Sequence, residues 1–283
     1  MQTSELLSVL DNNLLADSYE IGVNPSDVRA RAAWDINFFA GICIPSVFRF
    51  PFPEFYVALF NFLLLAIERK DPAMMEKVLR IAVGLPRGFA KSTFLKILVC
   101  YLIVHDKISF ILIICATEDL AENFIEDVHD ILSSPNVESI YGMWEKNLVI
   151  DNKLVKKASY RTRIVIIKGA GAGTAVRGLL MVHQRPDFVL CDDMQTKEND
   201  ESDSESASLF LWFVGTLLKV VTPFNSIVFY IGNMYSERCI LYRLKESASW
   251  TTLITGAILA MGESLWDSLH SLRSLYESFA HDE

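Results

Sequence analysis

The chain has 283 residues, of which 51% are apolar and 11% aromatic, so it can build a full hydrophobic core and is not a disordered polypeptide. Its 26 Lys and Arg residues against 35 Asp and Glu give a net charge of −9, which excludes a surface that is basic throughout but allows a local nucleic-acid site. The longest apolar runs, Val57–Ile67, Ile97–Val104 and Phe110–Ala116, are shorter than the ~18–20 residues that cross a membrane.

The cysteines and histidines show no metal-binding pattern. The five cysteines are widely spaced among apolar neighbours and include no Cys-x-x-Cys pair, and the five histidines form no spaced cluster. This usage predicts reduced, buried thiols in an intracellular protein and gives no indication of a zinc site.

The first 70 residues have the pattern of helices interrupted by a proline-rich segment. An amphipathic stretch runs from Ser4 through Leu15, and a strongly apolar helix is expected at Phe55–Lys70. The segment Ile44–Pro53 between them contains three prolines, which are incompatible with a helix. We therefore predict an N-terminal helical subdomain, residues 1–78, that includes a rigid, aromatic connector.

From Leu79 onward, short apolar strands alternate with helices. The expected strands are Arg80–Leu85, Ser109–Ala116, a pair at Leu148–Lys157 and Arg161–Ile167, Phe188–Cys191, Ser226–Ile231 and Trp250–Ile258. The expected helices are Lys91–Val104, Glu118–Leu132, Ser202–Val221 and Ser236–Ser247. Such alternation predicts an α/β fold with a mainly parallel central sheet flanked by helices. Its core would span residues 79–258, followed by a C-terminal segment at 259–283.

The most informative local pattern is Gly84-Leu-Pro-Arg-Gly-Phe-Ala-Lys-Ser-Thr93, which lies between an expected strand and an expected helix. Backbone N–H groups of such a turn, together with the helix N-terminus, bind phosphate oxygens. Lys91 would reach the β- and γ-phosphates of a nucleotide, and the Ser92 hydroxyl would bind Mg²⁺. The candidate phosphate-binding residues are Pro86, Arg87, Gly88, Phe89, Ala90, Lys91, Ser92 and Thr93.

This loop departs from the common pattern Gly-x-x-x-x-Gly-Lys-Ser/Thr, because Leu85 and Ala90 stand at the two glycine positions. Arg87 adds a second positive charge, which would lie near the γ-phosphate, where negative charge develops during phosphoryl transfer. The alternative is a strand–turn–helix whose lysine is a solvated cap.

Two carboxylates follow the apolar strand Phe188–Cys191. In nucleotide-hydrolysing proteins of this kind, the first acid holds Mg²⁺, here Asp192, and the second polarises the attacking water, here Asp193. The chain between Lys91 and Asp192 is long enough for a further strand–helix unit and a pair of strands, which favours P-loop NTPases with an additional strand between the two motifs. The alternative is a strand that meets a loop with solvated acids.

The glycine-rich stretch Gly169–Gly178 is not followed by a lysine, so a second phosphate loop is disfavoured. We expect a flexible loop that presents Arg177, which would act as a catalytic arginine on a neighbour's nucleotide. The alternative is a surface arginine without a catalytic role.

Five segments occur in one order and resemble the ATPase domain of the terminase large subunit, the DNA-packaging motor of tailed bacteriophages. They are Pro86–Thr93, Ile113–Thr117, Thr174–Gly178, Val189–Asp193 and Phe229–Asn233. The resemblance covers roughly Phe38 to the C-terminus.

The resemblance implies roles for the matching positions. Gly232 and Asn233 correspond to the coupling motif, more often Gly-Thr, which senses the γ-phosphate and transmits hydrolysis to motion. Arg177 corresponds to an arginine proposed to act in trans within a ring. The connector around Phe50–Phe55 falls where the family has its adenine contacts.

The resemblance also implies Mg²⁺-dependent ATP hydrolysis that drives double-stranded DNA into a preformed capsid. The implied partners are the portal protein and prohead, a small terminase subunit and further copies of the chain in a ring, and the implied location is the cytoplasm of an infected bacterium, transiently at the capsid portal. The family's nuclease domain follows this region, so DNA cleavage is not expected from these residues. The alternatives are a helicase-like nucleic-acid translocase and a non-catalytic nucleotide-binding assembly module.

Overall fold

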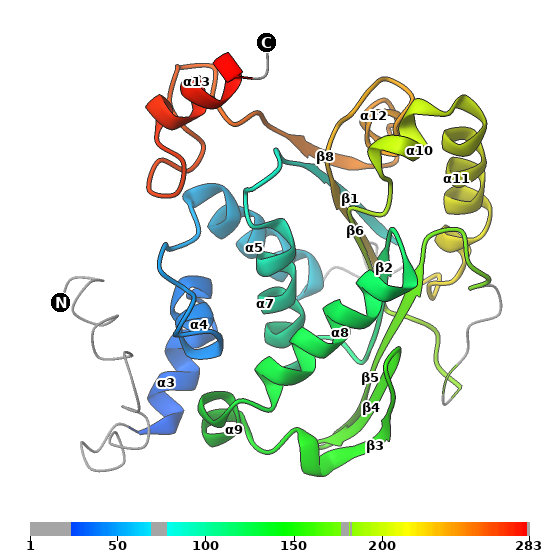
Figure 1. The fold of residues 1–283 in the computed structure, drawn as a ribbon. Helices are drawn as coiled ribbons and strands as arrows, with labels where there is room; N and C mark the ends of the chain where they lie inside the picture. The colour runs from blue at the N-terminus through cyan, green and yellow to red at the C-terminus, as the bar shows by residue number, and fades with distance from the viewer. Residues whose placement is uncertain (1–23, 69–77, 177–180, 182, 282–283) are drawn as a thin grey trace.

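The computed structural model describes residues 24–68, 78–176, 181 and 183–281, and these form an α/β structure with helices on both faces of one sheet (Figure 1). The strands are β1 (Leu79–Gly84), β2 (Phe110–Cys115), β3 (Leu148–Asp151), β4 (Val155–Tyr160), β5 (Arg163–Gly171), β6 (Phe188–Asp192), β7 (Ile227–Gly232) and β8 (Thr251–Ile254). Their order in the sheet is β3-β4-β5-β2-β6-β7-β1-β8.

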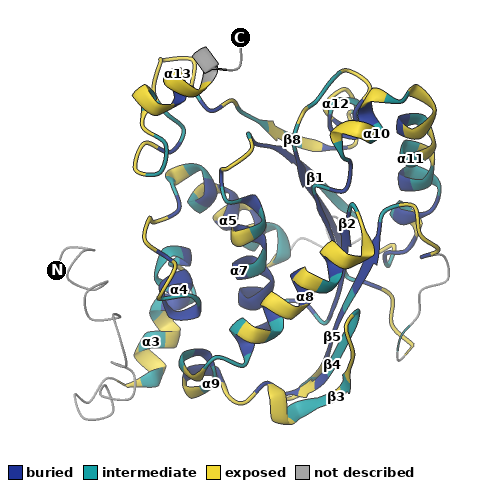
Figure 2. Ribbon diagram, viewed as in Figure 1, coloured by how far each residue is buried: buried dark blue, intermediate teal, exposed yellow. Residues whose placement is uncertain are grey.

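The sheet is parallel from β5 to β8 and antiparallel at the edge formed by β3, β4 and β5. Every residue of β2, β6 and β7 is buried, because helices cover both faces of these strands (Figure 2). Continuous apolar runs are typical of parallel strands in such a position. The prediction of a mainly parallel sheet flanked by helices is confirmed.

Alternate residues along β1, β2, β6 and β7 enter two separate hydrophobic clusters, one on each face of the sheet. Ile81 and Val83 pack on one side with α4, α5, α7, α8 and α9, whereas Ala82 packs on the other side with α11 and α12. The helices are α3 (Pro25–Ala32), α4 (Ile36–Cys43), α5 (Glu54–Ile67), α7 (Lys91–Val104), α8 (Glu118–Leu132), α9 (Pro135–Tyr141), α10 (Lys197–Glu201), α11 (Asp203–Gly215), α12 (Ile240–Lys245) and α13 (Leu272–His281). Two short 3₁₀ helices lie at Glu145–Asn147 and Leu217–Lys219.

Helix α7 is the central helix of the larger cluster and is buried on nearly all sides. The sequence predicts its bounds, and those of α8, correctly, because Thr117 caps α8 through the N–H of Leu120 and apolar residues recur along both helices. Helices α3, α4 and α5 pack into the same cluster as the sheet. The described N-terminal helices therefore share one core with the strands.

Several predicted elements differ in their bounds. The expected strand pair at residues 148–167 is a meander of three strands, since chain reversals separate β3 from β4 and β4 from β5. The expected helix Ser202–Val221 corresponds to α11, which follows the N-cap residue Ser202 but ends at Gly215. The amphipathic stretch Ser4–Leu15 lies outside the described residues.

The glycines read as the start of a flexible loop belong instead to strand β5. A Cβ at Gly169 would lie 2.9 Å from Cδ1 of Ile125, and one at Gly171 would lie 2.9 Å from the backbone N of Glu118. Glycine is therefore required where α8 packs closely against the strand. The predicted loop begins only after Gly171.

No helix in the described part of the chain combines the length and the apolar character needed to span a membrane.

Candidate nucleotide-binding site

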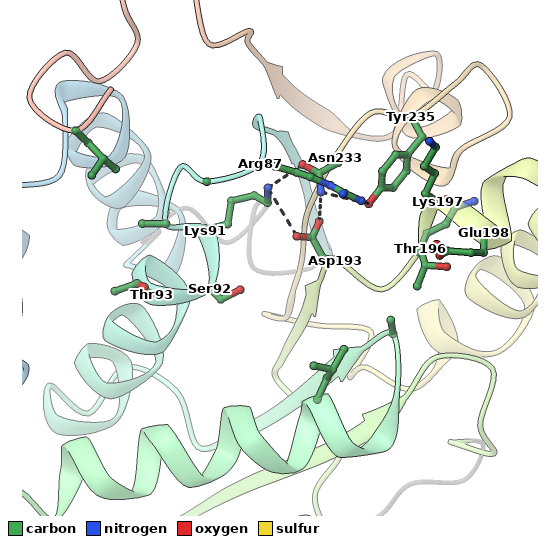
Figure 3. Close-up of a pocket in the computed structure, with 16 residues that line it drawn as sticks. Arg87, Lys91, Ser92, Thr93, Asp193, Thr196, Lys197, Glu198, Asn233 and Tyr235 are labelled. Carbon is green, nitrogen blue, oxygen red and sulfur yellow. Dashed lines mark hydrogen bonds and ion pairs between the residues drawn. The ribbon is translucent and has the colours of Figure 1, made fainter. Parts of the chain in front are cut away.

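The candidate site lies at the carboxyl ends of three neighbouring strands, β1, β7 and β6. Lys91 begins α7, directly after the loop that follows β1, Asp193 follows β6, and Asn233 follows β7. Because the carboxyl ends of parallel strands meet at one edge of the sheet, three segments that are distant in sequence converge there (Figure 3). A pocket of about 800 Å³ opens at this edge, lined by Arg87, Gly88, Ala90, Lys91, Ser92, Thr93, Ala116, Leu120, Asp193, Gln195, Thr196, Lys197, Glu198, Asn233, Tyr235 and Leu269.

The loop between β1 and α7 has the backbone shape of an anion-binding turn. Gly88 has φ +79° and Ala90 has φ +50°, both in the left-handed region. Ala90 is the N-cap of α7 and makes no side-chain capping hydrogen bond, so the first N–H groups of the helix are directed to the pocket without a competing acceptor from the cap. A phosphate would meet both these groups and the positive end of the helix dipole.

Lys91 is buried, with 6% of its surface exposed, at the base of this loop. Its Nζ donates to the backbone oxygens of Leu85 (3.3 Å) and Pro86 (3.0 Å) and to Oδ1 of Asn233 (2.9 Å), and lies 3.7 Å from Oδ2 of Asp193. Burial lowers the pKa of Lys91, and the charges of Asp193 and Asp192 oppose that effect. The ammonium group is therefore held in place with acidic partners before any nucleotide enters.

Asp192, the last residue of β6, has the surroundings of a cation ligand. Burial raises its pKa to about 6, while a hydrogen bond from the Ser92 hydroxyl acts in the opposite direction. Its Oδ1 is buried and has no hydrogen-bond partner, an arrangement that costs free energy unless a ligand satisfies it. Asp192 and Ser92 therefore fit a Mg²⁺ ion.

Among the described residues, no group of three or more His, Cys, Asp or Glu side chains is placed to hold a metal. Mg²⁺ does not require such a group, because it usually takes one or two protein ligands and completes its octahedron with water and substrate phosphates.

Asp193 is joined to both Lys91 and Asn233 in the polar network of Figure 3. Its Oδ1 accepts a hydrogen bond from Nδ2 of Asn233 (3.1 Å), and its Oδ2 faces Lys91. Burial raises the pKa of Asp193, and the Lys91 charge is the largest effect that lowers it. Its backbone is left-handed, with φ +41°, which turns the chain at the strand end and leaves the side chain in the pocket rather than in the sheet.

Arg87 and Tyr235 form a second pair at the rim of the pocket. The Tyr235 hydroxyl accepts from Nη2 of Arg87 (3.2 Å) and from Nδ2 of Asn233 (3.3 Å), and the Arg87 guanidinium lies 5.5 Å from the centre of the tyrosine ring. The sequence analysis did not identify Tyr235, although it lies two residues beyond Asn233 at the same strand end.

The loop between β1 and α7 is also held from the N-terminal and C-terminal parts of the chain. The Tyr56 hydroxyl on α5 donates to the backbone oxygen of Phe89 (2.6 Å). From the segment before α13, His270 places Nε2 3.0 Å from the backbone oxygen of Gly88, and its ring packs at a tilt on the Phe89 ring, with 4.8 Å between the ring centres. No local sequence pattern marks Tyr56 or His270, because both act only through tertiary contacts.

The aromatic connector is not part of the pocket. Phe52 is 3% exposed and packs among the rings of Phe48, Tyr56, Phe94 and Trp266. Phe48 and Phe52 are therefore used in the core, whereas Phe50 is exposed. The apolar side chains that line the pocket are those of Ala90, Ala116, Leu120 and Leu269.

Two further residues were predicted for the site, Gly232 and Arg177, and the structure describes only the first. Gly232 ends β7 beside the site, and a Cβ there would lie 3.4 Å from Oδ1 of Asp193. Arg177, the predicted arginine acting on a neighbour, lies outside the described residues.

No protein-family model matches the chain, and no curated protein is similar enough to count as a relative.

Proposed function

We propose that the chain is a Mg²⁺-dependent ATPase domain of the P-loop class with an additional strand. The observation that carries the proposal is the convergence of Lys91, Asp193 and Asn233 in one pocket at the carboxyl edge of the sheet, where Ser92, which also lines the pocket, is hydrogen-bonded to the buried Asp192. Strand order supports it, because β7 lies between the strand of the phosphate loop, β1, and the strand of the acidic pair, β6.

Each residue then has a task that its position allows. The loop and the N-terminus of α7 bind the phosphates, with Lys91 directed at the β- and γ-phosphates. Ser92 and Asp192 hold Mg²⁺, which supplies charge neutralisation on the phosphate oxygens when bound. Asp193 orients the attacking water and accepts its proton, for which its raised pKa is an advantage.

Asn233 connects Lys91 with Asp193 and is therefore placed to respond when a γ-phosphate draws Lys91 away. Such a change would reach strand β7, which ends at Gly232. This is the coupling role that the resemblance to terminases implies for Gly232 and Asn233.

We further propose that the hydrolysis drives double-stranded DNA into a capsid, as the motor of a terminase large subunit. This step rests on the order of the five motifs that the sequence shares with that family. It implies the portal protein, the prohead, a small terminase subunit and a homo-oligomeric ring as partners in an infected bacterial cell.

The test is phosphate release from ATP with and without Mg²⁺, by the parent chain and by Lys91→Ala and Asp193→Asn. We expect Lys91→Ala to lose ATP binding, and Asp193→Asn to bind ATP but release phosphate at least ~100-fold more slowly. Lys153→Ala, whose side chain is 82% exposed on the meander, is the matched control and should behave as the parent does.

The outcomes separate the alternatives. Hydrolysis by both site variants at the parental rate would show that the site is wrongly assigned. ATP binding by the parent without turnover at any protein concentration would favour the non-catalytic module. Stimulation by single-stranded but not double-stranded DNA would favour a helicase-like translocase.

A further inference from the structure

We propose that Tyr235 is a positioning residue for ATP hydrolysis, which sets the place of Arg87 and the orientation of Asn233. The inference rests on the proposed function, and it adds a residue that none of the motifs contains. Tyr235 does not need to touch the nucleotide, because it acts through the two side chains that it binds.

The tyrosine hydroxyl is the only atom that joins Arg87 to Asn233 among the hydrogen bonds of the described residues. A phenolic oxygen has two lone pairs, and here one faces Nη2 of Arg87 and the other faces Nδ2 of Asn233. Figure 3 shows the three side chains side by side at the rim of the pocket. Both acceptor positions of Tyr235 are thus used by residues of the site.

The contact with Arg87 restricts a long side chain that is otherwise exposed. A free arginine samples many rotamers, and ordering it during the reaction costs entropy at that moment. The hydroxyl and the ring face of Tyr235 together hold the guanidinium beside Asn233, on the side of the pocket where Asp193 lies. Arg87 is therefore preorganised next to the position that a γ-phosphate would take.

The contact with Asn233 favours one orientation of its amide group. Oδ1 must face the Lys91 ammonium, which can only donate, and Nδ2 must face acceptors. Tyr235 and Asp193 supply those two acceptors. Loss of the tyrosine oxygen would leave Nδ2 with Asp193 alone and weaken the fixed geometry between Lys91 and Asp193.

The first experiment compares the kinetics of ATP hydrolysis by the parent, Tyr235→Phe and Tyr276→Phe. Tyr276 is exposed on α13, far along the chain from the site, and serves as the matched control. We expect Tyr235→Phe to lower kcat about tenfold with KM changed less than about twofold, because positioning is lost while phosphate binding by Lys91 and the loop stays. In an Arg87→Ala background, the same substitution should lower kcat by less than about threefold, because one of the two partners is already gone.

An unchanged kcat in Tyr235→Phe, or a rise in KM alone, would overturn the proposal. Equal losses of kcat in the two backgrounds would also overturn it, since the effect would then not pass through Arg87.

The second experiment needs no turnover. Arginine reagents such as phenylglyoxal attack the neutral guanidine, and the hydrogen bond to Tyr235 raises the pKa of Arg87. In the nucleotide-free protein, we expect Tyr235→Phe to increase the modification rate of Arg87 several-fold, measured by peptide mass spectrometry against Arg273 as an internal standard. An unchanged rate would overturn the positioning role even if the parent chain does not hydrolyse ATP, so failure of this inference is distinguishable from failure of the proposed ATPase.

Discussion

Three polar residues lie together at the edge of a hydrophobic sheet: Lys91, Asp193 and Asn233. Each is a hydrogen-bond or ion-pair partner of the other two. The buried ammonium of Lys91 has two backbone oxygens, an amide oxygen and a carboxylate around it, so its charge is compensated. Asp192 differs, since one of its buried oxygens has no partner. Residues that lower the free energy of unfolding of the ligand-free protein are frequent at functional sites, where a bound ligand supplies the missing polar partner.

Asp192→Asn should stabilise the protein while removing Mg²⁺-dependent hydrolysis. The rise of the pKa from 3.8 to about 6 means that the folded state holds a proton more tightly than the unfolded state. Proton binding by Asp192 therefore stabilises the folded state at low pH, and this stabilisation is lost as the pH rises through about 6. The ionised carboxylate then costs about 3 kcal/mol at pH 7.

The measurement is urea unfolding without Mg²⁺ at pH 7 and at pH 4. We expect Asp192→Asn to raise the free energy of unfolding by about 1–3 kcal/mol at pH 7 and by much less at pH 4. Asp130→Asn, on the exposed side of α8, should change neither value. A less stable Asp192→Asn protein at pH 7 would contradict the assignment of Asp192 as an uncompensated ligand.

At the scale of elements, the phosphate loop depends on segments from both ends of the described chain. Helix α5 contacts it through Tyr56, and the segment before α13 contacts it through His270. Trp266 connects these two supports, because its ring packs against that of Tyr56 and its backbone oxygen accepts a hydrogen bond from the N–H of His270 (2.8 Å). A change in the loop on nucleotide binding would therefore be felt in the C-terminal segment.

His270→Ala should loosen the loop without unfolding the protein. The substitution removes a contact with the Gly88 oxygen and a tilted ring contact with Phe89, through which the imidazole holds the loop. We expect faster backbone hydrogen exchange in residues 86–90 and about a two- to fivefold weaker affinity for ADP.

The exchange experiment uses Arg273→Ala as its control, since that side chain is 88% exposed on α13. His270→Phe, which keeps an aromatic ring on Phe89 but lacks the nitrogen, should lie between the parent and His270→Ala. Unaltered exchange in both His270 variants would show that the C-terminal segment does not support the loop.

At the scale of the whole molecule, the pocket is open and its described cationic lining consists of Arg87, Lys91 and Lys197. In the proposed motor, a neighbouring chain would add Arg177 to this pocket. An active site that needs an arginine from a neighbouring chain is complete only in an oligomer. The ATPase activity should therefore depend on protein concentration.

The expected result is a specific ATPase activity that rises with concentration, together with oligomer formation followed by light scattering. Arg177→Ala should bind ATP with parental affinity but lose turnover, and mixing it with Lys91→Ala should restore part of the activity at interfaces that combine an intact loop with an intact arginine. Constant activity from a monomer would mean that one chain holds the complete site, and Arg177 would lose its proposed role.

Local sequence patterns were sufficient to predict the strands and helices that surround the site. Residue order predicted the apolar run of β2, the helices Lys91–Val104 and Glu118–Leu132, and the two acids at the end of β6. Such predictions succeed because periodicity and capping act within a few residues. The same reasoning failed for Gly169 and Gly171, where glycine reflects close packing of α8 on β5 rather than a loop. A composition pattern does not distinguish these two uses of glycine.

The α/β class, the mainly parallel sheet and most of the side chains that meet at its carboxyl edge could thus be predicted from residue order. Which of these side chains touch depends on the folded chain: Asn233 joins Lys91 to Asp193, Tyr235 binds Arg87, and Phe52 of the aromatic connector packs inside the core. The physical reason is the range of the forces involved. Helix and strand patterns arise between residues a few positions apart, whereas contacts between residues 87 and 235, or 88 and 270, exist only once the strand order has been established.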